Sequence, residues 1–125
     1  MNTLRIPIGY WAYMLAMSGD NYYSGGQLAV MKRIAQYAIT KNNMNIVVDL
    51  HGLPGGKNGL DNQGNTCQLT WWNNQTNTNL SIEMVRKATD DILKQPNAGS
   101  FTPSLIIEPM LALYYFDQTK TRSLT

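Results

Sequence analysis

Apolar and polar residues follow two periods along the chain, and these periods predict alternating strands and helices. Residues 25–43 carry apolar side chains three and four positions apart, as on one face of a helix, and residues 79 or 81 to 95 repeat this pattern. A continuous β-branched run at residues 45–50 predicts a strand buried on both faces. Shorter apolar runs at 4–8 and 101–107 predict two more strands. The order β-α-β-α-β indicates a parallel sheet and an α/β fold.

Each predicted helix has one apolar face, and each strand is followed by a loop. The apolar positions are Leu28, Met31, Ile34, Ala35, Ala38 and Ile39 in the first helix and Leu80, Met84, Ala88 and Ile92 in the second. We expect Lys32, Arg33 and Gln36 to face away from the core, and Glu83 to lie in the first turn of the second helix. Because proline removes a ladder N–H, Pro7 is expected where its strand opens into a loop.

The charge balance argues against several classes of partner. Ten Lys and Arg against eight Asp and Glu give a formal net charge of +2, and the basic residues are scattered rather than interleaved with aromatics. We therefore expect no nucleic-acid partner. No apolar run approaches the ~20 residues of a membrane-spanning helix. The first residues lack the apolar segment of a signal peptide, so they resemble the interior of a domain.

Three further features bear on the compartment. Cys67 is the only cysteine, so it forms no disulfide within the chain; a cytosolic thiol, a partner to a cysteine elsewhere and an inert buried residue stay open. Asn74-Gln75-Thr76 and Asn79-Leu80-Ser81 are glycosylation sequons that fit a surface loop if the parent protein is secreted. Abundant Asn and aromatics with only 14% charged residues are common in secreted carbohydrate-active proteins.

Three polar residues lie where a parallel sheet places its chemistry, at or near the carboxyl ends of strands. Arg5 lies in the first strand, His51 ends the second, and Glu108 follows the third. Glu108 has apolar neighbours in the sequence, and such neighbours raise the pKa of a carboxyl group and favour a general acid. The alternative is a structural Glu that caps the strand or pairs with a Lys. His51 is the only histidine, and it could be a catalyst or a structural residue. The sequence contains no cluster of His, Cys or carboxylate residues at the spacing of metal ligands, so we expect no metal site.

Aromatic residues gather in the predicted loops, where they could stack on sugar faces or pack the loops together; they are Tyr10, Trp11, Tyr13, Trp71 and Trp72. Other enzyme motifs are missing from the sequence. It contains no Gly-x-Gly-x-x-Gly, no Walker loop and no Gly-x-Ser-x-Gly elbow. We therefore expect no nucleotide site, and no cofactor of any kind.

Two long motifs resemble glycoside hydrolase family 5, most closely its fungal-type exo-β-1,3-glucanases. The segment 4–11, Leu-Arg-Ile-Pro-Ile-Gly-Tyr-Trp, resembles the second-strand motif of that family. The segment 49–64, Asp-Leu-His-Gly-Leu-Pro-Gly-Gly-Lys-Asn-Gly-Leu-Asp-Asn-Gln-Gly, is similar to its third strand and the long loop after it. The resemblance covers most of residues 4–110. It implies an incomplete (β/α)8 barrel, about strands two to four with their helices, in one partial catalytic domain over residues 1–125.

The resemblance also assigns roles to residues. It implies a retaining mechanism in which Glu108, before Pro109, matches the acid/base glutamate that ends the fourth strand. Arg5 would support the nucleophile, and His51 would hydrogen-bond the sugar nearest the cleaved bond. Further substrate-binding residues are expected at Tyr10, Asn58, Asp61 and Asn62, of which Asp61 and Asn62 would line the glucose pocket.

The sequence departs from the family pattern at two residues, and two further observations bear on the catalytic glutamates. Ile107 replaces the Asn that precedes the acid/base, and Leu60 stands where these glucanases usually carry Phe. Residues 99–103 followed by an apolar strand also resemble the fifth strand, and in that register Glu108 is not the acid/base. Glu83 and Glu108 are the only glutamates, and Glu83 lies in a helix, so no residue is available as the nucleophile.

These observations leave three functional interpretations. In the first, the chain is a fragment of an extracellular or cell-wall enzyme that releases glucose from β-1,3-glucan ends, and it is inactive alone. In the second, it is a barrel remnant that binds β-glucan without hydrolysing it. In the third, the parent has another family 5 specificity, such as β-1,6-glucanase or cellulase-like activity.

Overall fold

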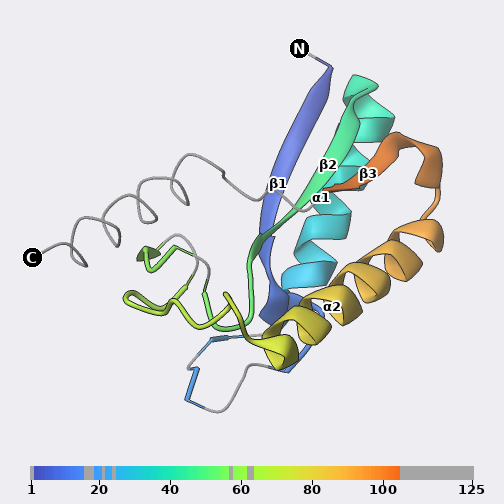
Figure 1. Ribbon diagram of the computed structural model, residues 1–125. Helices are drawn as coiled ribbons and strands as arrows, with labels where there is room; N and C mark the ends of the chain where they lie inside the picture. Colours follow the sequence, from blue (N-terminus) through green and yellow to red (C-terminus); the bar gives the residue numbers. More distant parts are fainter. Residues whose placement is uncertain are drawn as a thin grey trace, which may run out of the picture.

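A three-stranded parallel sheet with two helices makes up the described part of the chain (Figure 1). The computed structural model describes residues 2–15, 19–20, 22–23, 25–56, 58–61 and 64–104, without the side chains of residues 103 and 104. The strands are β1 (Thr3–Gly9), β2 (Asn45–Gly52) and β3 (Phe101–Ser104), in the order β1-β2-β3. The helices are α1 (Gln27–Asn42) and α2 (Gln75–Leu93), with single 3₁₀ turns η1 (Tyr10–Ala12) and η3 (Ala98–Ser100). The predicted α/β class and parallel sheet are confirmed.

The hydrophobic core lies between the sheet and the two helices, which cover the same side of it (Figure 1). Ile46, Val48 and Leu50 of β2 are at most 1% exposed. They share one core with Met31 of α1 and Met84 of α2. The β-branched run predicted the central strand of the described sheet, but the expected burial on both faces is only partly met. The face under the helices is completely buried, whereas Val47 and His51 on the other face are partly exposed.

Strand β1 extends past the proline that was expected to end it. Pro7 pairs with Asp49 inside the parallel ladder, and the strand continues to Gly9. In the described sheet β1 is an edge strand. A proline is tolerated there because an edge strand has one side on which no ladder bond is lost.

Helix α2 begins earlier than its apolar period indicated. Its first residue is Gln75, and the Asn74 side chain caps it by accepting the backbone N–H of Asn77 at 3.1 Å. The predicted start at residue 79 or 81 was wrong because the first turn carries only polar side chains. Glu83 consequently lies in the third turn, not the first, and pairs with Lys87 at 2.8 Å.

Two polar residues of α1 that were expected to face away from the apolar stripe contact the α2 region at the side of the helix. Lys32 contacts the Asp91 carboxylate of α2 at 2.5 Å, and the Gln36 side chain donates to the Pro96 carbonyl at 2.9 Å. Lys32 reaches α2, and Gln36 reaches the segment after it, because the two helices lie side by side on the sheet (Figure 1). Ile34, expected in the apolar face, is instead 47% exposed.

An apolar groove runs along the open edge of β1, beside α1. It has a volume of about 480 Å³, and its lining includes Ile6, Ile8, Trp11, Val30 and Ile34. Val30 and Ile34 are each 47% exposed, and nearby Tyr37 is 65% exposed. An open strand edge beside an apolar helix face is a surface that promotes association between chains.

We expect the chain to self-associate through this groove. Sedimentation velocity at increasing concentration should show species heavier than the monomer, because both the edge of β1 and the apolar face of α1 gain partners. Ile34→Lys should shift the distribution toward monomer. Ile82→Lys is the matched control, since Ile82 is 53% exposed but lies among charged residues of α2. A chain that stays monomeric at every concentration contradicts this prediction.

Candidate functional site

Polar side chains line the face of the sheet that the helices do not cover. In the parallel register Arg5 of β1 faces Val47 of β2, so Arg5, Val47 and Asp49 project from one face, and Val48 projects from the other. Near the carboxyl end the register slips by one residue, because Gly9 pairs with Gly52 and leaves His51 as an extra residue in β2. Bulges of this kind redirect a side chain next to a binding site.

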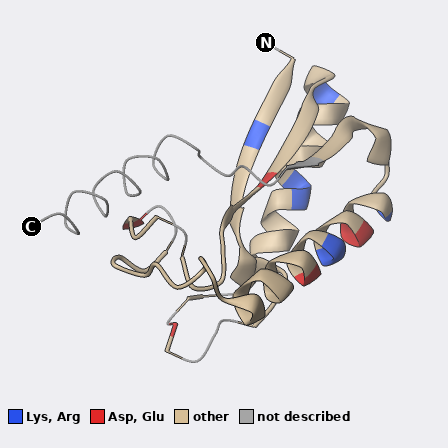
Figure 2. Cartoon of the chain, in the orientation of Figure 1, with Lys and Arg blue, Asp and Glu red and all other residues tan. Residues whose placement is uncertain are grey.

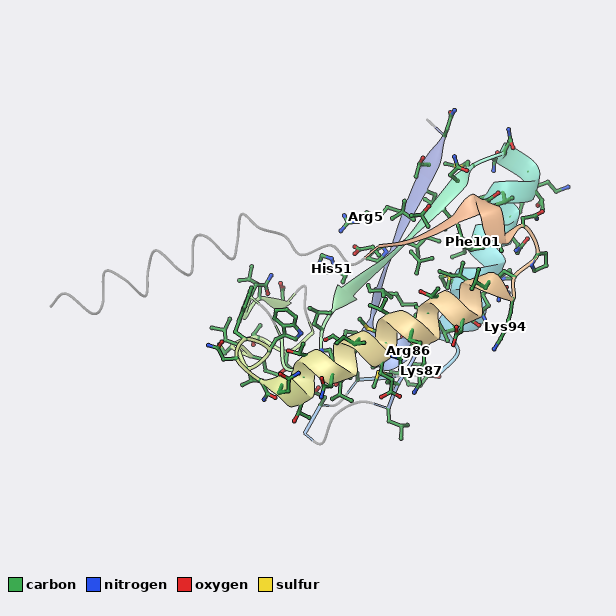
Figure 3. The ribbon with its side chains drawn as sticks, turned by 45° about the vertical axis from the view of Figure 1, so that its right-hand side comes forward. Arg5, His51, Arg86, Lys87, Lys94 and Phe101 are labelled. Carbon is green, nitrogen blue, oxygen red and sulfur yellow. The ribbon has the colours of Figure 1, made fainter. Side chains whose placement is uncertain are left out.

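Arg5, Asp49 and His51 form one hydrogen-bonded cluster on this face. The Arg5 guanidinium donates to Asp49 Oδ2 from Nε at 3.0 Å and from Nη2 at 2.5 Å. His51 Nδ1 lies 3.1 Å from the same oxygen and 3.4 Å from Arg5 Nη2. Figure 3 shows Arg5 and His51 on the side of the sheet away from α2. Arg86 and Lys87, which belong to α2, lie on the other side. The structure thus brings together two of the predicted site residues.

The third member, Asp49, was not predicted as a site residue. Its side chain is fully buried, whereas the side chains of Arg5 and His51 are 48% and 13% exposed. A signal was present in the sequence, because an acid inside a buried strand is almost never left unpaired. The pattern Val47-Val48-Asp49-Leu50 therefore pointed to a cation on a neighbouring strand.

Tyr10, predicted to bind substrate, is buried in a contact between two loops. It is 1% exposed, and its hydroxyl donates to Asp20 Oδ2 at 2.5 Å. The other oxygen of Asp20 accepts from Asn65 Nδ2 at 2.8 Å and from Gln68 Nε2 at 3.0 Å. Asp20 thereby joins the loop after β1 to the loop after β2. Tyr10 therefore helps to hold the two loops together, and its predicted contact with substrate stays a prediction.

The other loop aromatics also pack against protein. Trp11 stacks on Tyr22, with ring centroids 4.0 Å apart. Trp71 donates its indole N–H to Ser81 of α2 at 2.9 Å. Burial, followed by the negative charge of Asp91, raises the pKa of the Tyr13 hydroxyl to about 12. For these three aromatics, the packing alternative is the one that the described contacts support.

The remaining predicted site residues belong to the loop after β2 or lie beyond the described chain. Asn58 is 3% exposed, and its Oδ1 accepts the backbone N–H of Leu60 at 3.0 Å, so it shapes the loop locally. Asp61 is exposed, and its carbonyl accepts the backbone N–H of Gly64 at 2.9 Å. Asn62 and Glu108 lie outside the described residues. Their predicted roles stay predictions.

The two glycosylation sequons and Cys67 lie in surroundings that differ from some of those expected. Asn74 caps α2 and Asn79 lies exposed within it, so neither sequon asparagine is in the body of a surface loop. Cys67 is exposed, which contradicts an inert buried thiol.

The described residues form neither a metal site nor a membrane span. No group of three or more His, Cys, Asp or Glu side chains is arranged to hold a metal ion in that part of the chain. Among the same residues, neither helix has the length and apolar character that crossing a membrane requires. Basic and acidic residues are interspersed along α2 (Figure 2).

Comparison with known proteins shows which proteins this chain is similar to. The chain is 36% identical over 124 residues to a glucan 1,3-beta-glucosidase of Pichia angusta, a match that covers 94% of this chain and 27% of that protein. It is 45% identical over 71 residues to a glucan 1,3-beta-glucosidase of Blumeria graminis, covering 57% and 16%. None of the protein-family models that were compared matches the chain.

A solved structure agrees with these relatives. The rutinosidase from Aspergillus niger superposes with a TM-score of 0.74 at 37% identity, covering 82% of this chain and 28% of that one. The resemblance predicted from the two motifs is therefore confirmed: the chain is similar to fungal glucan 1,3-beta-glucosidases and to a rutinosidase of known structure. It spans roughly a quarter of the length of the Pichia angusta relative.

Proposed function

We propose that this chain is part of the catalytic domain of a retaining glycoside hydrolase that releases glucose from β-1,3-glucan ends. The observation that carries the proposal is the Arg5–Asp49–His51 cluster on the uncovered face of two adjacent parallel strands, in which His51 lies next to the carboxyl end of β2. Active-site groups collect at that end of parallel sheets. The glucan 1,3-beta-glucosidases among the relatives supply the substrate class.

The incomplete barrel is part of the same proposal. Three strands in sequential order with both helices on one side is the arrangement of βα units in a (β/α)8 barrel. The described strands would then be the second, third and fourth of eight. The open groove beside β1 supports this interpretation, because a preceding βα unit would cover it.

The proposed chemistry needs two carboxyl groups about 5–5.5 Å apart. Glu108 is the candidate acid/base. Glu83 is excluded as the nucleophile because it lies in α2 and pairs with Lys87 at 2.8 Å. In this proposal Arg5 supplies positive charge near the nucleophile and His51 hydrogen-bonds the sugar, while the nucleophile itself belongs to a part of the parent enzyme that this chain lacks.

We therefore expect the chain alone not to hydrolyse glucan. Incubation with a laminarin-type oligosaccharide should release no glucose above the buffer control, from the native chain or from Glu108→Gln, because no glycosyl-enzyme intermediate can form without the nucleophile. Turnover by the native chain that Glu108→Gln abolishes would overturn the inactive-fragment proposal.

Two alternatives make different predictions. A glucan-binding remnant would show saturable binding of the same oligosaccharide without turnover, and His51→Ala would weaken that binding. A different specificity is favoured by the likeness to the Aspergillus niger rutinosidase, at 37% identity. A binding preference for a rutinosidase substrate over the laminarin-type oligosaccharide would support that alternative.

The location of the parent enzyme is also a proposal. We infer an extracellular or cell-wall enzyme, because the composition is low in charge and rich in Asn and the two sequons are present. The DNA flanking this reading frame offers a direct test of the parent. A continuation that encodes a Glu at a later strand end supports the fragment, and its absence supports the remnant.

A further inference from the structure

One carboxylate oxygen organises both functional side chains of the cluster. Three nitrogen atoms lie within hydrogen-bond distance of Asp49 Oδ2. They are Nε and Nη2 of Arg5, at 3.0 and 2.5 Å, and Nδ1 of His51, at 3.1 Å. The carboxylate is fully buried, so it exchanges no hydrogen bonds with bulk water. A buried anion with such contacts fixes the positions of the groups that donate to it.

The His51 ring has two possible protonation patterns in this position. With a proton on Nδ1, the ring donates to Asp49 Oδ2 at 3.1 Å. Without that proton, Nδ1 can only accept from Arg5 Nη2, at the longer distance of 3.4 Å, and its lone pair then lies against the carboxylate. The shorter contact and the negative charge both favour the first pattern, since an ionised carboxylate accepts and never donates.

We propose that Asp49 is the positioning residue of this site, which holds His51 with its proton on Nδ1 and so makes Nε2 the accepting nitrogen. The histidine then receives a hydrogen bond from a sugar hydroxyl and does not donate one. The same oxygen holds Arg5 by its Nε and Nη2 edge, so Nη1 and its two N–H groups face away from Asp49. The inference rests on the proposed function for its meaning, but it concerns the protein without substrate.

The bulge at His51 supports this role. His51 Nδ1 reaches the carboxylate oxygen of Asp49, two residues earlier in the strand, although the register slips between Ile8 and Gly9 opposite them. A redirected side chain in a bulge depends on a specific partner for its orientation. Asp49 provides that partner from within the same strand.

The single histidine allows a direct test. Long-range proton–nitrogen NMR of the full chain, labelled with ¹⁵N and kept well above the ordinary histidine pKa of about 6.5, reports which ring nitrogen of His51 carries the proton. We expect a protonated Nδ1 and an unprotonated Nε2 in the native chain. A protonated Nε2 in the native chain overturns the proposal without any variant, and glucan hydrolysis plays no part in the result.

Variants assign the effect to Asp49. Asp49→Leu removes the accepting oxygen, so the protonated Nδ1 signal should be lost in favour of protonated Nε2. Asp49→Asn keeps an oxygen without the charge and serves if the leucine variant fails to fold, with a mixture of the two forms expected. Asp91→Leu is the matched control, because it breaks a carboxylate–cation pair with Lys32 away from the cluster. A tautomer unchanged in both Asp49 variants, or changed equally by Asp91→Leu, contradicts the role of Asp49.

Discussion

Replacement of Arg5 with methionine is expected to lower the free energy of unfolding by about 3 kcal/mol, because it leaves a buried carboxylate without its cation. Asp49 is fully buried and has Arg5 Nη2 at 2.5 Å. The Arg5 side chain is 48% exposed, so solvent screening places the loss at the lower end of the range for buried pairs. Urea denaturation followed by far-UV circular dichroism measures the change.

Two comparisons separate this effect from the loss of any salt bridge. Lys87→Met breaks the exposed pair with Glu83, whose side chains are 48% and 46% exposed, and should cost under about 0.5 kcal/mol. The double variant Arg5→Met with Asp49→Leu removes both charges and should recover at least about half of the Arg5→Met loss. A loss for Arg5→Met no larger than that for Lys87→Met would show that Asp49 does not depend on Arg5.

The sequence predicted the elements whose hydrophobic pattern is continuous. Strand β2 was found to within two residues, because Ile46, Val48 and Leu50 pack into the core while the strand keeps its neighbours on both sides. The start of α2 was missed because polar residues cap and begin it, and Asn77 is buried for a hydrogen bond to Thr70 rather than for apolar contact. Hydrophobic periodicity does not show that a polar residue is buried.

The candidate site was predictable in part for a similar reason. His51 stood out because it lies next to the carboxyl end of β2, where parallel sheets place functional groups, and Arg5 stood out through the family motif that contains it. Asp49 was hidden inside an apolar run, and only the strand pairing reveals that Arg5 reaches it. The contact between Tyr10 and Asp20 was not predictable from the sequence, because it depends on two loops that meet only in the fold.

The loop after β2 leads to the second prediction, at a glycine of the Gly-Leu-Pro-Gly-Gly segment. Gly55 has φ +78°, and a Cβ there would lie 2.3 Å from Asn77 Nδ2 and 2.5 Å from Thr70 Oγ1. Gly55→Ala is expected to cost about 3–4 kcal/mol, about 1 of it from the left-handed backbone and the rest from displacing the buried Asn77 amide from the Thr70 carbonyl. Urea denaturation measures the total.

A second glycine with the same backbone angle isolates the steric part. Gly26 also has φ +78°, but nothing lies within 4 Å of its ideal Cβ. Gly26→Ala should therefore cost only about 1–1.5 kcal/mol, from backbone strain and the change of helix cap. In Gly55→Ala, hydrogen exchange should also accelerate at the Thr70 and Trp71 amides, which donate to the Gly55 and Gly56 carbonyls at 2.8 and 3.2 Å. Equal losses in the two variants would mean that backbone angle alone requires glycine at position 55, and that the loop does not rely on close contact with α2.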